Sequence, residues 1–183
     1  MNLVLVVGIS GVGKTTLCAA YAARRPEICH LTASYLIARR LKTTVQNLRD
    51  MKVRSELLSN QRALAEELQY ERRKIGRRPV LLDGQCVLDT GAKLIVLPPD
   101  ELMVLGPTAL MLLELDVDEL LRRRSADNKK RPSRTAAELE IQMAVNHEAV
   151  SRYGLRLGVP VKIVRAEAAQ FSPAADELFE MRR

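Results

Sequence analysis

The first sixteen residues constrain the fold more than any other part of the chain. An apolar run from Asn2 to Val7 leads without a gap into the sequence GISGVGKT at residues 8–15. This is the GxxxxGK[ST] pattern of a phosphate-binding loop, and it lies between a predicted strand and a predicted helix, where such loops function. The pattern therefore predicts an α/β domain that binds a nucleoside triphosphate.

Each part of this loop has a physical reason to hold phosphate. Glycines let backbone N–H groups close around an anion, and the helix that follows turns the positive end of its dipole toward it. We expect Lys14 to reach the β- and γ-phosphates of ATP, and the hydroxyl of Thr15 to hold Mg²⁺. The residues expected to bind the nucleotide are Gly8, Ile9, Ser10, Gly11, Val12, Gly13, Lys14, Thr15 and Thr16.

The length and composition fit one globular domain. A chain of 183 residues can bury the core of a single α/β domain and is short for two. No apolar run approaches the roughly 18 residues that a membrane-spanning helix needs, so no membrane association is expected. The widely spaced Cys18, Cys29 and Cys86 form no CxxC pair, which favours reduced thiols and a cytoplasmic location.

The net charge of +7 raises the question of a nucleic-acid partner. Aromatic residues make up only 3% of the chain and tryptophan is absent, so base-stacking platforms are scarce. A site for polyanionic nucleotides also needs arginines and lysines. We therefore favour small-molecule nucleotides as the partners and keep nucleic acid as the less favoured alternative.

Predicted strands and helices alternate along the whole chain. This alternation predicts a parallel sheet of about five strands with helices on both faces and ligands at the carboxyl ends of the strands. A polar connector is expected over residues 42–50. Strands are expected over residues 2–7, 28–31, 80–82, 108–115 and 159–164, with helices over 14–25, 33–41, 53–75, 117–124, 135–153 and 173–183.

Several polar residues stand out against this apolar pattern. Asp83 ends a buried strand, where its carboxylate can hold Mg²⁺ directly or through water, although a helix-capping role is the alternative. Gln61 falls within the apolar stripe of helix 53–75, and either satisfies a buried group or faces a cavity. His30 has no metal partner nearby and is better explained as a core or strand-end residue. The inner stripe of helix 135–153 is expected to be Leu139, Met143, Asn146, Val150 and Tyr153.

The densest group of basic residues follows the strand at 108–115. A segment that runs from one helix end to the next helix can close over phosphates, exclude water and neutralise the charge that develops during phosphoryl transfer. A solvated basic surface is the alternative for any single arginine. The group comprises Arg122, Arg123, Arg124, Lys129, Lys130, Arg131 and Arg134.

These features together resemble the adenylate kinases, and more closely their archaeal branch, over nearly the whole chain. The similarity is most specific in ELLRRRSADNKKR at residues 119–131, in the long helix that carries Asn146, and in YGLRLGVPVKIV at 153–164. The resemblance implies a single domain over residues 1–183 with the P-loop NTPase fold and ATP and Mg²⁺ as its cofactors. It also implies a monophosphate-binding arm over residues 33–75 and a lid over residues 122–135.

The same resemblance implies roles for individual residues. Lys14, Arg123 and Arg131 would stabilise the transferring phosphoryl group, and Thr15 and Asp83 would lie near Mg²⁺. The residues implied for the acceptor are Arg40 or Arg49 for its phosphate and Gln61 and Gln85 for its base.

Two positions depart from the archaeal pattern. Asp83-Gly84-Gln85 stands where those enzymes usually carry Asp-Thr-His, and Pro132 follows the lid arginine in place of Asp. We therefore predict ATP-dependent phosphorylation of a nucleoside monophosphate, with AMP leading and a deoxynucleotide as another candidate. One alternative is a small-molecule hydroxyl acceptor, with Asp83 as its base. Another is an ATPase regulator with an RNA or protein partner.

Overall fold

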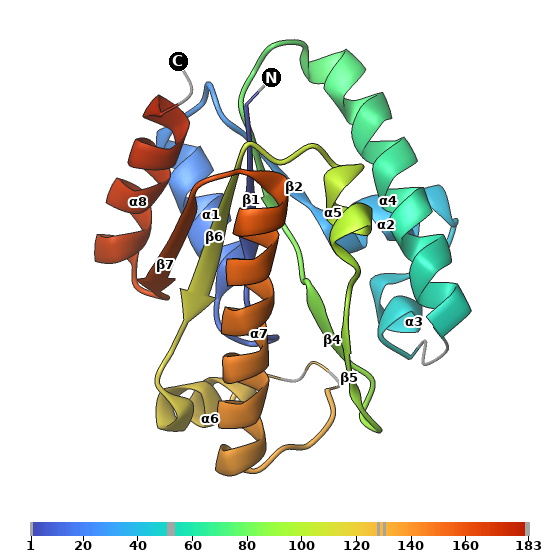
Figure 1. Ribbon diagram of the computed structural model, residues 1–183, viewed down its shortest axis with the longest axis vertical. Coiled ribbons are helices and arrows are strands. Elements are labelled where there is room, and N and C mark those ends of the chain that lie inside the picture. The colour runs from blue at the N-terminus through green and yellow to red at the C-terminus, as the bar shows by residue number, and fades with distance from the viewer. Residues whose placement is uncertain (1, 51–53, 128, 130, 182–183) are drawn as a thin grey trace.

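Strands and helices alternate in the computed structural model, which describes residues 2–50, 54–127, 129 and 131–181 (Figure 1). The strands are β1 Leu3–Val7, β2 Cys29–Thr32, β3 Val80–Asp83, β4 Val87–Asp89, β5 Leu94–Val96, β6 Ala109–Glu114 and β7 Val161–Arg165. The helices are α1 Lys14–Arg24, α2 Ala33–Arg40, α3 Val45–Asp50, α4 Arg54–Ile75, α5 Pro99–Met103, α6 Val117–Ser125, α7 Ala136–Leu157 and α8 Ala168–Glu180.

The main sheet has five parallel strands in the order β2-β3-β1-β6-β7. β1 lies at its centre and pairs with β3 on one side and β6 on the other. The register places Val6 opposite Asp83, so the end of β3 lies beside the end of β1, where the glycine-rich loop begins. The predicted parallel sheet of about five strands is therefore confirmed.

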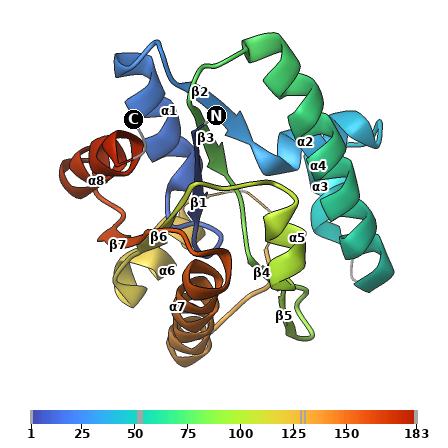
Figure 2. The same ribbon diagram turned by 45° about the horizontal axis from the view of Figure 1, so that its top comes forward.

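β1 contributes to a separate core on each face of the sheet. Its residues Leu3, Leu5 and Val7 belong to one core, and Val4 and Val6 belong to the other, because successive strand residues point to opposite faces. α2, α4, α5 and much of α7 contribute to the first core, while α1, α6 and α8 contribute to the second (Figure 2). Coverage on both faces explains why the strand is apolar at every position.

A small antiparallel hairpin follows the third strand of the main sheet. β4 pairs with β5, and the Oδ1 atom of Asp89 accepts a hydrogen bond from the backbone N–H of Gly91 at 2.9 Å in the turn. β4 also contacts α7, so the hairpin lies near the carboxyl ends of the parallel strands.

The structure corrects three expectations from the sequence. The connector expected over 42–50 contains α3, because Thr44 Oγ1 accepts the backbone N–H of Asn47 at 3.1 Å at the start of this helix. The helix expected to begin at residue 173 begins at Ala168, so Pro173 lies inside α8. The added first turn of this helix buries Phe171 in the core. The helical spacing of Leu17, Ala20 and Tyr21 predicts that these residues form the inner side of α1. The structure instead buries Lys14, Cys18 and Tyr21, and Ala20 is exposed.

Candidate functional site

A cavity of about 1210 Å³ opens at the carboxyl ends of the parallel strands. It is lined by the glycine-rich loop and the start of α1, by the residues after β3, by α2 and α4, by the β4–β5 hairpin, by α7 and by the segment between α6 and α7. Open α/β sheets bind their ligands at this edge. The cavity therefore lies where the sequence predicts the functional site.

The glycine-rich loop approaches the neighbouring strand closely. Gly8 has a φ of +147°, and a Cβ added there would lie 2.6 Å from the backbone oxygen of Leu113, so only glycine fits. Gly13, with a φ of +108°, caps the N-terminus of α1. Of the residues predicted to bind the nucleotide, those that line the cavity are Ser10, Gly11, Gly13, Lys14, Thr15 and Thr16, while Gly8, Ile9 and Val12 do not line it.

Lys14 is buried beneath the loop that it terminates. Its side chain has only 8% exposure, and Nζ donates hydrogen bonds to the backbone oxygens of Gly8 at 2.6 Å and Ile9 at 3.0 Å. Burial lowers the pKa of Lys14 from 10.5 to about 8, and the nearby charge of Asp83 opposes this shift. The ammonium group is thus held in place by two carbonyl groups inside the cavity wall.

Asp83 is held between two side chains of the neighbouring strand. It is 4% exposed, and its Oδ2 atom lies 3.3 Å from both Nε2 of His30 and Oγ1 of Thr32. β2 pairs with β3 with Thr32 opposite Asp83 at the ends of their strands, and His30 lies two residues earlier on the same strand. His30 lies inside β2, opposite Leu81, and is half-buried, so it is a strand residue that contacts Asp83 and does not end the strand.

The oxygen atoms near the loop suit Mg²⁺ bound together with phosphates. Thr15 supplies a hydroxyl and Asp83 a carboxylate, and both residues line the cavity. Across the described residues, no group of three or more His, Cys, Asp or Glu side chains is placed to hold a metal ion. Mg²⁺ commonly takes one or two protein oxygens and completes its octahedron with substrate phosphates and water. The residues present fit that mode of binding.

Arginines from α6 and the segment after it contact the glycine-rich loop directly. Arg123 Nη1 donates to the Val12 backbone oxygen at 3.0 Å, and Arg124 Nε donates to the Ser10 backbone oxygen at 2.9 Å. Arg131 Nε donates to the hydroxyl of Ser10 at 3.0 Å. Burial, followed by the charge of Arg131, lowers the pKa of Arg124. Three guanidinium groups thus lie around the loop that is predicted to bind phosphates.

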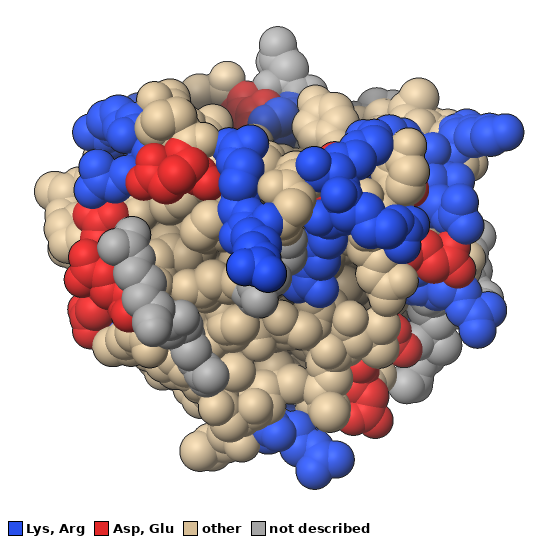
Figure 3. Space-filling model, turned by 90° about the horizontal axis from the view of Figure 1, so that it is seen from above, with Lys and Arg blue, Asp and Glu red and all other residues tan. Residues whose placement is uncertain are grey.

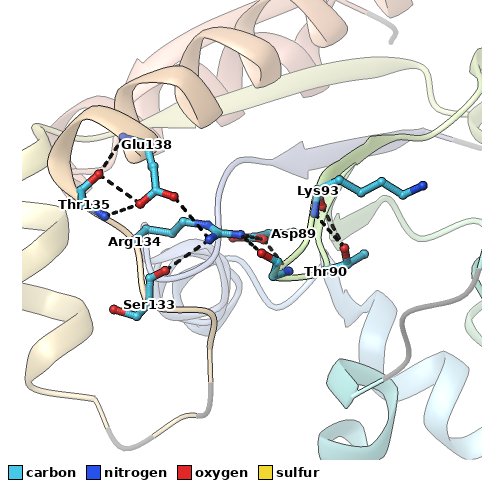
Figure 4. Close-up of polar contacts among 8 residues, drawn as sticks. Asp89, Thr90, Lys93, Ser133, Arg134, Thr135 and Glu138 are labelled. Atoms are coloured by element: carbon cyan, nitrogen blue, oxygen red, sulfur yellow. Dashed lines mark hydrogen bonds and ion pairs between the residues drawn. The ribbon is translucent and has the colours of Figure 1, made fainter.

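An ion pair joins this basic segment to the β4–β5 hairpin (Figure 4). Arg134 donates to Asp89 through Nη2–Oδ1 at 2.7 Å and Nε–Oδ2 at 3.1 Å, and its Nη2 also donates to the Gly91 backbone oxygen at 2.8 Å. The next residue, Thr135, forms a capping box with Glu138 that begins α7. The end of the segment is therefore fixed by a bidentate contact on one side and a helix cap on the other.

Only some of the residues predicted to bind the acceptor line the cavity. Gln61, which is 8% exposed, and Gln85, which is exposed, both line the cavity. Arg40 does not line it, and its Nη2 forms an ion pair with Oε2 of Glu66 at 2.5 Å between α2 and α4. The side chain of Arg49 lies outside the described residues, although its backbone belongs to α3.

Sequence reasoning missed several residues that the fold brings to the cavity. Thr32 and Asp89 both line it. The place of Thr32 depends on β2 lying beside β3, and Asp89 is held by Arg134, 45 residues away in the sequence. Gln142 also lines the cavity and is 2% exposed. A helical spacing that continued from Leu139 through Gln142 would have indicated its burial, but its polar character argued against a position in the inner stripe.

Part of the positive charge lies far from the cavity. The face at the opposite end of the molecule, toward the amino ends of the strands, carries many Lys and Arg side chains where α1 and α4 end (Figure 3). The last turns of these helices contain Arg24, Arg72, Arg73 and Lys74. Within the described ranges, no helix combines the length and apolar character needed to cross a membrane.

Comparisons with known proteins agree with this geometry. A family model described as an AAA domain matches residues 7–142. Over its full length, the chain is 27% identical to the adenylate kinases of Methanococcus vannielii and Methanococcus aeolicus, in each case over 98% of the relative. A shikimate kinase from Acinetobacter baumannii in complex with shikimate superposes with a TM-score of 0.62 at 15% identity, over 99% of this chain and 92% of that one. The P-loop NTPase fold predicted from the sequence is confirmed.

Proposed function

Because the chain belongs to the AAA domain family, we propose that it is an ATP-dependent kinase of the adenylate kinase type that phosphorylates a nucleoside monophosphate. The observation that carries the proposal is the large cavity at the carboxyl ends of the strands. Lys14 and the arginines of the α6–α7 segment surround its phosphate loop, and carboxamides from α4 and the end of β3 line it as well. The full-length similarity to archaeal adenylate kinases supports the same assignment.

The glycine-rich loop and the start of α1 form the donor site in this proposal. The triphosphate of ATP binds the backbone N–H groups of the loop, and Lys14 contacts the phosphates nearest the bond that breaks. Thr15 and Asp83 would hold Mg²⁺, which would neutralise phosphate charge when ATP is bound. His30 and Thr32 keep the Asp83 carboxylate directed toward this position.

Arg123 and Arg131 stabilise the transferring phosphoryl group. In the free protein Arg123 donates to the Val12 backbone oxygen and Arg131 to the Ser10 hydroxyl, which are neutral acceptors beside the phosphate loop. The same guanidinium groups also pair with the carboxylates of Glu119 and Asp127. Hydrogen bonds from guanidinium to phosphate oxygens are roughly twice as strong as those to neutral groups. A bound phosphate chain would therefore replace the two neutral acceptors, while Glu119 and Asp127 keep the guanidinium groups beside the oxygens that gain charge during transfer.

The acceptor binds at the side of the cavity formed by residues 33–75, and residues 122–135 act as the lid of a single domain. Gln61 and Gln85 contact the acceptor base. Arg49 is favoured over Arg40 for the acceptor phosphate, because Arg40 would first have to release Glu66. AMP is the leading acceptor, a cytoplasmic location is expected, and nucleic acid is not favoured as a partner.

The test is a transfer assay with ATP, Mg²⁺ and a panel of nucleoside monophosphates, deoxynucleotides and small hydroxyl compounds. Rapid conversion of one monophosphate to its diphosphate, lost in the Lys14→Met variant, supports the proposal. Transfer to a hydroxyl compound alone would assign the alternative acceptor class, with Asp83 as its base. Slow ADP release at one rate, whatever acceptor is present, would exclude a kinase and favour an ATPase with a macromolecular partner.

A further inference from the structure

Gln142 is a buried carboxamide in the wall of the cavity. It lies on α7, it is 2% exposed, and it is among the residues that line the cavity. Its Oε1 atom is buried and accepts no hydrogen bond within the described part of the chain. Buried polar atoms are nearly always paired, so an unpaired carbonyl oxygen at a cavity wall calls for a partner that enters the cavity.

The residue one turn further along α7 does not serve as that partner. Asn146 Nδ2 donates a hydrogen bond to the backbone oxygen of Gln142 at 2.8 Å, and Asn146 Oδ1 accepts one from the buried thiol of Cys86 at 3.8 Å. Both ends of the Asn146 amide are therefore engaged with the protein. The Gln142 side chain is left with its hydrogen-bonding capacity available to a ligand.

Gln142 lies on α7 between the two cores: Leu139 and Met143 pack with the core of α1, α6 and α8, whereas Val145 packs with the core of α2, α4 and α5. α7 contacts β4 and α5, and its residues Ala149, Val150 and Tyr153 share a core with α2, α4 and α5 on one face of the sheet. Ala166, Glu167 and Ala168, which precede or begin α8, line the cavity from the opposite face. One turn further along α7, Asn146 contacts Cys86, the residue after Gln85, so Gln142 lies near one of the two carboxamides that the proposed function assigns to the acceptor base.

We propose that the Gln142 side-chain carbonyl accepts a hydrogen bond from a neutral N–H or O–H group of the acceptor nucleotide and thereby selects the acceptor. This inference rests on the proposed function. A carbonyl oxygen cannot donate to phosphate, so its partner is an amino group of the base or a hydroxyl of the sugar. A buried site that hydrogen-bonds a substrate group rejects analogues lacking it, because the protein atom is then left unpaired.

The test replaces Gln142 with Met, which has a similar length, favours helix and cannot form the hydrogen bond. The acceptor nucleotide found with the wild-type protein should lose about 10- to 100-fold in kcat/KM, while the KM for ATP stays unchanged. Gln69→Met on the exposed face of α4 is the matched control and should leave both values unchanged. A Gln142→Met value within twofold of wild type would overturn the inference.

Two analogues identify which group donates the hydrogen bond. The wild type should discriminate against either the 2′-deoxynucleotide or the nucleotide whose base amino group is replaced by a carbonyl. Gln142→Met should lose discrimination against that analogue alone, which a purely structural role of Gln142 would not produce. A general loss of activity that keeps both discrimination ratios at wild-type values would contradict the inference.

A binding measurement separates this inference from the proposed function. The shift in thermal midpoint caused by AMP is measured with the wild type, Gln142→Met and Gln69→Met. A shift that Gln142→Met alone loses supports the inference even if no nucleotide is phosphorylated. An equal shift in all three proteins, or none in any, overturns it. Without nucleotide, Gln142→Met should unfold at the wild-type temperature or above, since it removes an unpaired buried polar atom.

Discussion

Burial of the Lys14 ammonium group should make the free protein less stable than it would be without that charge. Lowering a lysine pKa from 10.5 to about 8 corresponds to about 3 kcal/mol at neutral pH, at 1.36 kcal/mol per pH unit. Lys14→Met removes this cost and also the hydrogen bonds to the Gly8 and Ile9 oxygens, each of which contributes about 1 kcal/mol. The variant should therefore be inactive and yet more stable by about 1 kcal/mol at pH 7.

The pH dependence of this difference follows from the direction of the shift. The folded protein releases the Lys14 proton near pH 8, whereas the unfolded chain keeps it to about pH 10.5. Between these values the unfolded state binds more protons, so the stability of the wild type rises with pH. Met does not titrate. The advantage of Lys14→Met should thus be largest below pH 8 and fall by about 2 kcal/mol by pH 9.5.

Urea unfolding of the nucleotide-free proteins at several pH values between 7 and 9.5 measures this effect. Lys93→Met, at an exposed lysine, serves as the control and should follow the wild type at every pH. Effects common to all proteins cancel in the difference between each variant and the wild type. A difference between Lys14→Met and wild type that stays constant across this range would refute the claim that Lys14 is desolvated in the free protein.

Three further substitutions test other parts of the structure. Arg131→Ala should lower kcat by about 100-fold or more with little change in ATP affinity, because its contact with phosphate strengthens in the transition state; equal losses in both would make it a binding residue. Asp89→Asn should lower the free energy of unfolding by about 1–3 kcal/mol in urea titrations by weakening the bonds to Arg134, and an unchanged midpoint would contradict this. Gly154→Ala should lower the free energy of unfolding by about 1–3 kcal/mol, because its Cβ would lie 2.2 Å from Val161 Cγ2. An unchanged midpoint of unfolding in calorimetry would show that Val161 can move aside without loss of stability.

The features that the sequence predicts well depend on local rules. The glycine-rich loop, the strand before it and the helix after it are set by adjacent residues, and the capping box of Thr135 and Glu138 spans a single turn. Continuous apolar strands between helices also indicate a parallel sheet covered on both faces. These patterns were sufficient to place the glycine-rich loop, and the cavity that it lines, at the carboxyl ends of the strands.

The features that the sequence left undetermined depend on which elements become neighbours. His30 meets Asp83 only because β2 lies beside β3, and strand order is not encoded locally. Arg40 resembles a phosphate ligand in sequence, yet α4 presents Glu66 to it. In α7 the expected inner position Met143 is half-buried and packs against the core of α1, α6 and α8, whereas Gln142 is fully buried in the cavity wall.

The central position of β1 has a consequence for how the chain acquires its structure during synthesis. Leu3 pairs with Val80 and Val4 pairs with Ala109, so the strand made first finds its two neighbours only after long stretches of chain. Such distant pairings slow folding, because the intervening loop must close before any contact is gained. Until β6 has left the ribosome, one edge of this apolar strand stays open to other chains. A nascent chain halted before residue 109 should therefore aggregate rather than fold in part.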